Sequence, residues 1–481
     1  MISPKDVASL VPEVYAEYRQ VVADGVMFFL ERLTGPRLSA ILAGQAALPA
    51  EAPPSQRLVG LMRECPALHK LGQVLARRRE LDPGFRRRLQ TLESMQSRID
   101  LSEVRPVILR ELGDHIERYR IRLEAQALAE ASVAVVIPFT WAGHNRSKAA
   151  AKREAGVLKV LKPRAAEYLE EDLEILGQVA DFLDERRKIY GLPPVEFREV
   201  FDEVRTILLH EIQVSGEQAH LAAAGRRYAG RRDVWVPRLY PFSTAGVTAM
   251  ERVDGVKVTE ASGESYRLRR NLARTIARAL ITEAIFSRRE RTIFHGDPHA
   301  GNLLAVPDGR LGVLDWSLTG ELTRHDRVQM SQILARALCG DRAGMAEAIS
   351  RLASETPSRE IVRPVVDRAM WELHSLLRPT VDWLMRLMDG AARAGVRFRP
   401  DLLLFRKSFF TLEGVITDLC PECSMEDFIT EVLIEEFAGE WPTRWLRPPL
   451  SRDYATHLSN ADLLEIGTMA PMRAMRWWLG L

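Results

Sequence analysis

The sequence predicts an α+β protein in which two helical sections flank a smaller section of mixed helix and strand. Three observations lead to this class. Apolar residues recur at helical spacing through much of the first 120 residues, short β-branched runs gather between about residues 133 and 250, and helical periodicity returns from Arg267 onward. A chain of 481 residues is long enough for roughly two to four structural units.

The composition is that of a soluble globular protein, with 46% hydrophobic and 27% charged residues. Lysine and arginine number 67 against 65 acidic residues, so no overall field favours nucleic acid, and we expect no nucleic-acid partner. The first residues lack the basic and apolar regions of a signal peptide, and no run reaches the roughly 18 apolar residues of a spanning helix. We therefore expect a cytoplasmic protein. Arginine clusters, such as residues 288–291, are interpreted as solvated helix faces, with a phosphate or lipid contact as the alternative.

The four cysteines do not form a disulfide framework. Cys65 and Cys339 stand alone, whereas Cys420 and Cys423 form a single CPEC. One C-x-x-C without a second pair is a weak signal for zinc or redox chemistry, so we expect reduced thiols.

Individual elements follow from periodicity and turn residues. Helices are predicted over residues 12–33 and 85–99, with a Pro/Ala-rich loop at 47–56 between them. The mixed section then predicts, in order, strand 133–137, turn 143–147, strand 156–163, a helix through 169–183, a helix over about 196–221, and strands 234–236 and 247–250. Beyond Arg267 we expect helices interrupted only by residues 294–317.

The stretch FHGDPHAGNLL, residues 294–304, contains the densest group of polar residues with catalytic chemistry. The following LLAVPDGRLGVLD has two apolar runs around Pro307-Asp308-Gly309, which predicts a hairpin. Such a hairpin would place Asn302 before one strand and Asp315 after the other, with Asp297 facing the same point. A metal between Asn302 and Asp315, and Asp297 near a nucleophile, is the arrangement of a kinase-type site.

Other interpretations of these residues remain open. Asp, Asn, Gly and Pro are also what ordinary turns use. His295 and His299 could be an HxxxH zinc pair, but that needs a continuous helix, which Pro298 disfavours.

Lys159 is the candidate cation for a phosphate group. It lies between Leu158 and Val160 on a predicted strand, and a lysine among apolar neighbours needs a partner. Glu211 and Glu217, on the predicted later helix, are the available carboxylates. By itself, a lysine in a strand is more often an edge residue.

The order of Lys159, Glu217, MERVDG, HGDPHAGN and LDWS resembles the atypical kinase-like proteins of the UbiB/AarF family. Two features separate that family from other kinase-like phosphotransferases with similar catalytic loops. One is a K-x-G-Q in a helical N-terminal extension, here Lys70 to Gln73. The other is an Ala-rich loop where protein kinases have glycines, here LAEASVAVV. The resemblance covers roughly residues 60–320 and extends more loosely to about 440.

The resemblance implies a protein-kinase-like bilobal fold with the N-terminal extension packed over the active site. The expected parts are a helical extension (1–120), an N-lobe (121–252), a mostly helical C-lobe (253–440) and a Trp/Arg-rich tail (441–481). The implied activity is that of an atypical kinase or ATPase using ATP and Mg²⁺, acting on or for a small or lipid-linked, quinone- or isoprenoid-type metabolite pathway. A biosynthetic partner protein is also expected.

The resemblance also implies a role for each matching residue. Lys159 would contact the nucleotide phosphates and pair with Glu217, Asp297 would be the catalytic-loop aspartate, and Asn302 and Asp315 would hold magnesium. The nucleotide would further meet the Ala-rich loop and the hinge, at Ala131, Ser132, Glu251 and Val253. Lys70, Gln73 and Glu211 would occlude the site from a protein substrate.

The sequence departs from the family pattern in several places. The family's E-x-D reads Glu211-Ile212-Gln213, and Ala134 and Val135 stand where the loop normally has glycine and glutamine. The D-F-G reads Asp315-Trp316-Ser317, and serine lacks the freedom of glycine at positive φ. No run in this sequence matches the pair of spanning segments that many members carry after the kinase region, so we expect no such pair.

Two other functions remain open. One is a small-molecule kinase of the aminoglycoside or choline type. The other is a nucleotide-binding pseudokinase that regulates a biosynthetic enzyme, which Gln213 and Ser317 favour.

The tail contains four of the nine tryptophans, mixed with arginine and leucine. This composition fits an interfacial segment in peripheral contact with a membrane. The alternative is that the aromatics cap the helical lobe or a partner surface.

Overall fold

The computed structural model describes residues 4–9, 11, 13–76, 82–90, 101–130, 133–142, 153–191, 197–198, 201–202, 205, 208–209, 212–373 and 378–478. The chain forms two compact units. Unit 1 comprises residues 1–226 and 237–252, and unit 2 comprises residues 227–236 and 253–481.

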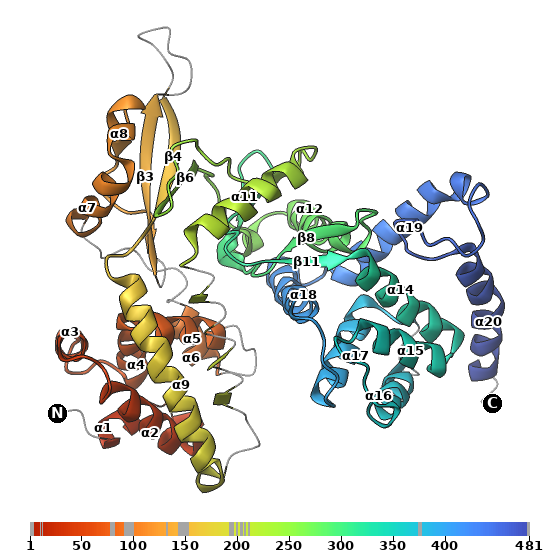
Figure 1. Cartoon of the computed structure of the whole chain (residues 1–481), viewed down its shortest axis with the longest axis horizontal. Helices are drawn as coiled ribbons and strands as arrows, with labels where there is room; N and C mark the ends of the chain where they lie inside the picture. The colour runs from red at the N-terminus through yellow and green to blue at the C-terminus, as the bar shows by residue number, and fades with distance from the viewer. Residues whose placement is uncertain are drawn as a thin grey trace. The chain divides into compact units, whose positions relative to one another are not determined.

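Unit 1 begins with a group of short helices, of which α2 and α5 pack against one long helix, α9 (Ala165–Tyr190), as Figure 1 shows. These are α1 (Pro4–Ser9), η1 (Glu13–Tyr18), α2 (Arg19–Leu30), α3 (Gly35–Ala46), α4 (Pro54–Glu64), α5 (Pro66–Ala76) and α6 (Pro83–Gln90). Their shared core includes Phe29 and Leu61 against Leu176 of α9. The predicted loop at 47–56 separates α3 from α4, which begins at Pro54 because proline's fixed φ suits a first helical turn.

The second part of unit 1 is an antiparallel sheet. Its strands are β1 (Arg122–Leu123), β2 (Ala129–Glu130), β3 (Ala134–Ala142), β4 (Arg153–Leu161) and β6 (Val247–Glu251). The order is β1-β3-β4-β6, with β2 also paired to β3. Helix α7 (Leu101–Leu112) covers one face, placing Ile108 in the same core as Ile137 and Phe139, and α8 (Asp114–Arg118) follows it (Figure 1). The strands predicted around residues 133 and 156 are thus confirmed, although both are nine residues long.

One predicted helix of unit 1 is wrong. Residues 196–221 were expected to form a single helix, but Ile212 and Gln213 are a turn and a coil residue, and α11 runs from Val214 to Tyr228. The first residues of α11, Val214-Ser215-Gly216, are all weak helix formers. The apolar periodicity therefore predicted a helix through Ile212 and Gln213, where the chain is not helical.

Unit 2 contains two small sheets. The strand order of the first sheet is β5 (Val234–Trp235), β10 (Leu311–Val313), β9 (Leu303–Ala305) and β7 (Val256–Lys257). The second joins β8 (Arg291–His295) to β11 (Thr319–Thr323). We did not predict β8 and β11, so the non-helical segment is longer than residues 294–317. Their short sequences mix charged and apolar residues and carry no clear alternation.

The remainder of unit 2 is helical, which confirms the α+β class. Its helices are η3 (Val258–Gly263), α12 (Tyr266–Ala277), η4 (Arg278–Thr282), α13 (Glu283–Ile285), η5 (Ala300–Asn302), α14 (Arg324–Cys339), α15 (Arg342–Leu352), α16 (Arg359–Glu372), α17 (Val381–Arg393), α18 (Pro400–Leu419), α19 (Met425–Arg444) and α20 (Asn460–Trp478). Local signals define their ends: Thr323 and Asp326 form a capping box at the start of α14, and Gly340, at φ 77°, closes it.

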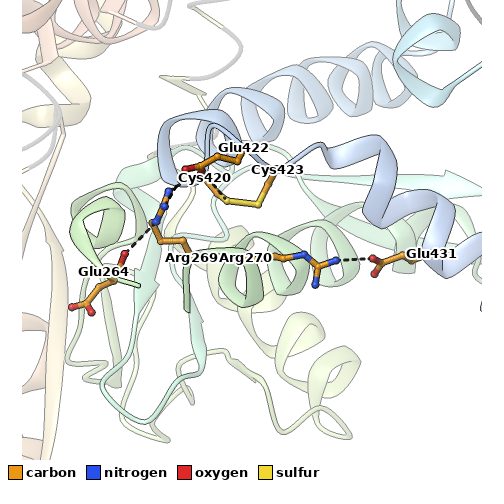
Figure 2. Close-up of a disulfide and its surroundings, with 7 residues drawn as sticks. All are labelled: Glu264, Arg269, Arg270, Cys420, Glu422, Cys423 and Glu431. Carbon is orange, nitrogen blue, oxygen red and sulfur yellow. Dashed lines mark hydrogen bonds and ion pairs between the residues drawn. A yellow bond between two sulfur atoms is a disulfide. The ribbon is translucent and has the colours of Figure 1, made fainter. Parts of the chain in front are cut away.

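Cys420 and Cys423 form a disulfide between the end of α18 and the start of α19, which corrects the expectation of four reduced thiols. A tight turn, in which the Cys423 N–H donates to the Cys420 carbonyl, brings the two Cα atoms to 5.3 Å. Figure 2 shows Glu422 of this turn reaching Arg269 of α12, which donates to both carboxylate oxygens at 3.0 and 3.2 Å. The turn is thereby fixed to α12.

Candidate active site

The predicted hairpin around Pro307-Asp308-Gly309 is confirmed by the antiparallel pairing of β9 and β10. Val313 is opposite Leu303, so Asn302 and Leu314 lie at the same end of the hairpin. The Leu314 N–H donates to the Asn302 carbonyl at 2.8 Å. Asn302 and Asp315 are therefore adjacent in space although they are 13 positions apart in the sequence.

The side chain of Asn302 holds the preceding loop. Its amide Nδ2 donates to the Asp297 carbonyl at 3.0 Å, and both residues are buried to 9% exposure. Because its NH₂ group points toward the Asp297 carbonyl, the amide oxygen Oδ1 points away from that carbonyl. Within the described part of the chain, Oδ1 accepts no hydrogen bond.

His295 connects the two polar segments of the site. The Asp297 N–H donates to His295 Nδ1 at 3.1 Å, and Nε2 lies 2.9 Å from the Leu314 carbonyl. Complete burial lowers the pKa of His295 and keeps the imidazole neutral, which matches one accepting and one donating nitrogen. His295 therefore positions Asp297 and the residue before Asp315.

The zinc interpretation of His295 and His299 finds no support here. No helix spans the pair, and His299 Nδ1 accepts from the Gly301 N–H at 3.1 Å. Among the residues that the structure describes, no group of three or more His, Cys, Asp or Glu side chains is placed to hold a metal.

Gly296 is required by close packing next to Asp297. A Cβ at this position would lie 2.9 Å from the Leu318 carbonyl oxygen and 2.8 Å from its Cγ, so a larger residue would displace the loop. The Gly296 carbonyl accepts a hydrogen bond from Ser408 Oγ of α18 at 3.1 Å. Sequence reasoning missed Ser408, because a lone serine 112 residues away carries no signal.

Asp315 itself adopts the left-handed conformation, with φ at 50°. Its Oδ1 accepts from the Ser317 N–H at 3.2 Å, an arrangement that an aspartate tolerates better than most residues. Ser317 does not have positive φ. The expected disadvantage of serine in place of glycine is therefore absent here, because the unusual backbone conformation belongs to Asp315.

The donor types of this site suit magnesium. Two carboxylates, Asp297 and Asp315, accompany the amide oxygen of Asn302, and hard oxygen donors of this kind are what Mg²⁺ prefers. Asn302 and Asp315, placed together by the hairpin, are the residues that fit the ion.

In unit 1, the structure brings Lys159 and Glu217 together. Lys159 lies near the middle of β4, between Val136 of β3 and Thr248 of β6. Its Nζ is 2.7 Å from Glu217 Oε1, and Glu217, in the first turn of α11, is only 3% exposed. The lysine is therefore on a central strand rather than an edge strand.

Three more predicted site residues lie at the end of β6, just after it, and in α5. Glu251 ends β6, and its Oε2 accepts from the Arg238 N–H at 3.3 Å, while Val253 begins the second segment of unit 2. Lys70 is buried in α5 at 4% exposure. Outside the described residues are Ala131, Ser132, Glu211 and the side chain of Gln73.

Residues 91–349, more than half of the chain, match the family described as the ABC1 atypical kinase-like domain. The chain belongs to this family. The predicted UbiB-type relationship and the kinase-like α+β fold are thereby confirmed. Members are enzymes of the phosphotransferase type with a kinase-like role that uses ATP, and kinase-like families in general use Mg²⁺ with it.

Two relatives illustrate the breadth of the match. The chain is 26% identical over 428 residues to the "Probable protein kinase UbiB" of Glaesserella parasuis serovar 5 (strain SH0165), covering 82% of this chain and 74% of the relative. It is 25% identical over 472 residues to the "Probable protein kinase UbiB" of Xylella fastidiosa (strain M23), covering 92% and 78%.

A solved structure titled "The complex structure of Rv3197-erythromycin from Mycobacterium tuberculosis" aligns with a TM-score of 0.48 at 18% identity, covering 85% of this chain and 94% of that one.

Across the described helices, none is both long enough and apolar enough to span a bilayer.

Proposed function

We propose that this ABC1-family protein binds Mg²⁺ and ATP and either transfers the terminal phosphoryl group to a small or lipid-linked acceptor or hydrolyses the nucleotide. The buried ion pair between Lys159 and Glu217 is the observation that carries the proposal. A lysine on a central strand, held at 2.7 Å by a carboxylate from a helix, is the arrangement that kinase-type sites use to contact nucleotide phosphates.

Each polar residue has a role in this proposal. Lys159 contacts the phosphates and Glu217 fixes the position of its ammonium group. Asn302 and Asp315 hold Mg²⁺, which neutralises charge developing on the phosphates. Asp297, held by Asn302 and His295, orients the acceptor hydroxyl or a water molecule. Ala131, Ser132, Glu251 and Val253 are proposed to complete the nucleotide site.

The proposed acceptor is a small or lipid-linked molecule of quinone or isoprenoid type rather than a protein. Lys70, Gln73 and Glu211 are proposed to occlude the site, as the resemblance implies. Four large apolar side chains, Trp441, Trp445, Leu446 and Leu450, are at least half exposed near the end of α19 and support peripheral contact with a membrane or a biosynthetic partner. We retain the four-part division at residues 120, 252 and 440 as part of the proposal.

The decisive experiment measures magnesium-dependent ATP turnover in the wild type and in Asp315→Ala, with folding checked by circular dichroism. We expect turnover to be lost with the fold retained. Equal turnover in both proteins would remove Asp315 from the mechanism. Turnover that needs an added amino or hydroxyl acceptor would favour the aminoglycoside- or choline-type alternative.

The pseudokinase alternative makes a different prediction in the same assay. Tight nucleotide binding without turnover at any magnesium concentration would establish it. Gln213, in the place of the family's aspartate, is the feature that favours this alternative.

A further inference from the structure

A cavity of about 480 Å³ lies within unit 2, apart from the catalytic loop. It is bounded by the end of α11, the π-helical turn η4 with α13, the segment before β8, and α19. None of the predicted nucleotide-site residues lines it. The lining residues are Arg227, Arg231, Arg278, Thr282, Glu283, Phe286, Ser287, Arg288, Arg289, Val432, Glu436 and Ala455.

The wall of this cavity is rich in arginine. Five arginines and only two glutamates line it. Glu283 is shared between Arg227, at 2.8 Å, and Arg231, at 2.6 Å. Asp233 and Glu435, which do not line the cavity, also pair with Arg231 and Arg278. Five guanidinium groups therefore have four carboxylates near them, and a bound anion would neutralise the remaining positive charge.

Two of the arginines have no acidic partner at salt-bridge distance. Within the described residues, the side chains of Arg288 and Arg289 form no hydrogen bond and no salt bridge, and both are exposed. By contrast, Arg278 is held by Glu435, which does not line the cavity, at 2.5 and 3.0 Å. The wall thus combines fixed arginines with two that can close on a ligand.

The fixed arginines are arranged in advance for an anion. Arg227 donates to the Glu283 carbonyl at 3.0 Å as well as to its carboxylate, and Arg231 forms a two-point contact with Asp233. Guanidinium groups held in this way lose little freedom on binding, and their remaining N–H groups can donate to phosphate oxygens.

A π-helical turn supplies part of the wall. Residues Arg278–Thr282 form π-helix between α12 and α13, and both end residues line the cavity. A π-helical turn is rare and occurs frequently at functional sites, because its extra residue redirects side chains. This backbone feature is independent of the charge imbalance and indicates that this region of the helix has a function.

The remaining lining residues restrict the ligand further. Phe286, Val432 and Ala455 contribute apolar surface. The cavity also falls within the size range of small-molecule sites and exceeds the needs of a single phosphate ion.

We propose that this cavity is a second binding site, for a phosphorylated molecule with an apolar part. Its phosphate contacts Arg288, Arg289 and the fixed arginines, while its apolar part lies against Phe286 and Val432. The source of the phosphate is either a free metabolite or the headgroup of an anionic lipid.

The test compares three proteins by titration calorimetry with inorganic pyrophosphate: the wild type, Arg288→Gln/Arg289→Gln, and Arg291→Gln. Arg291 is a matched control, because it follows two residues later and is 71% exposed but does not line the cavity. Both mutated cavity arginines are exposed, so the double variant should retain its fold. Because pyrophosphate also resembles the phosphates of ATP, each titration is repeated in a Lys159→Ala background.

We expect pyrophosphate binding that survives Lys159→Ala and becomes about tenfold weaker or more in Arg288→Gln/Arg289→Gln, with Arg291→Gln unchanged. Co-sedimentation with phosphatidylglycerol-containing vesicles, against pure phosphatidylcholine, distinguishes the sources. Vesicle binding that depends on the same arginines assigns the phosphate to a lipid, whereas pyrophosphate binding alone assigns it to a free metabolite. Equal affinities in all three proteins, or no binding of either probe, would overturn the proposal.

Discussion

Nζ of Lys159 lies 2.7 Å from Oε1 of Glu217, a contact between a central strand and a helix that are 58 residues apart in the sequence. Their side chains are 13% and 3% exposed, so the pair is largely removed from water. Burial of two charges is costly unless they are paired, and the pair is better explained by a function than by stability. Its proposed function is to present one ammonium group to the nucleotide phosphates.

Removal of one partner of this pair should destabilise unit 1. Lys159→Ala leaves the Glu217 carboxylate buried without its counter-ion, and we expect the free energy of unfolding in urea to fall by about 3 kcal/mol. The double variant Lys159→Met/Glu217→Leu replaces both charges by apolar groups and should regain most of this loss while still failing to bind nucleotide. A double variant as unstable as Lys159→Ala would show that the charge imbalance is not the cause.

Because Asp315 has a left-handed backbone conformation, two substitutions at this position should differ in stability although both lose turnover. At φ 50°, glycine is tolerated without strain and alanine is not. We expect Asp315→Gly to unfold with a free energy about 1 kcal/mol higher than Asp315→Ala, while both lose magnesium-dependent turnover. Chemical denaturation of the two variants measures the difference, and an alanine variant at least as stable as the glycine variant would argue against this backbone conformation.

His457 should make stability depend on pH. Its Nε2 lies 3.0 Å from the Ile285 carbonyl, and its buried Nδ1 has no hydrogen-bond partner, so a second proton would find no acceptor among the described residues. Burial and the nearby Arg327 lower the pKa of His457 to about 4, whereas an exposed histidine titrates near 6.5. Between these values the unfolded chain binds the proton more readily.

The stability that the folded protein gains from neutral, buried His457 is therefore fully present above pH ~6.5. It is lost as the pH falls toward about 4, and the free energy of unfolding should fall by about 3 kcal/mol. His457→Asn is the matched variant, because asparagine tolerates the local φ of 56°. Urea unfolding of the wild type and of His457→Asn at several pH values should show that the difference between their free energies of unfolding changes across this pH range. Parallel curves would contradict the assignment.

The disulfide determines how many cysteine thiols an alkylating reagent can label before reduction. Alkylation of the denatured protein without reductant should label two cysteines, Cys65 and Cys339, and four after reduction. Mass spectrometry distinguishes the two results, and four labelled thiols before reduction would contradict the bond. Because the closed loop is very short, Cys420→Ser/Cys423→Ser should lower the free energy of unfolding by only about 2 kcal/mol.

Local sequence signals predicted the hairpin of the catalytic loop, and through it the proximity of Asn302 and Asp315. Pro307-Asp308-Gly309 between two apolar runs is a turn whose register follows from nearby residues alone. That Lys159 needs a charged partner was likewise predicted from Leu158 and Val160 on either side, and Glu217 was one of the two carboxylates expected. Where a few adjacent residues determine the geometry, the sequence was sufficient.

Features that depend on distant residues could not be predicted. The hydrogen bond from Ser408 to Gly296 joins segments 112 residues apart, and the pairing of β8 with β11 depends on elements that fold around them. Arg288 and Arg289 were interpreted as part of a solvated helix face, because the sequence gives no indication that η4 and α19 enclose a cavity beside them. Tertiary packing, rather than local propensity, determines each of these features.

The most direct test of the central claim is the thermal stability of the wild type and of Lys159→Ala with ATP or ADP, in the presence and absence of Mg²⁺. Ligand that binds only the folded protein raises the melting temperature. We predict a magnesium-dependent increase in the wild type that is lost in Lys159→Ala. No increase in either protein would contradict a nucleotide site at the ion pair of Lys159 and Glu217.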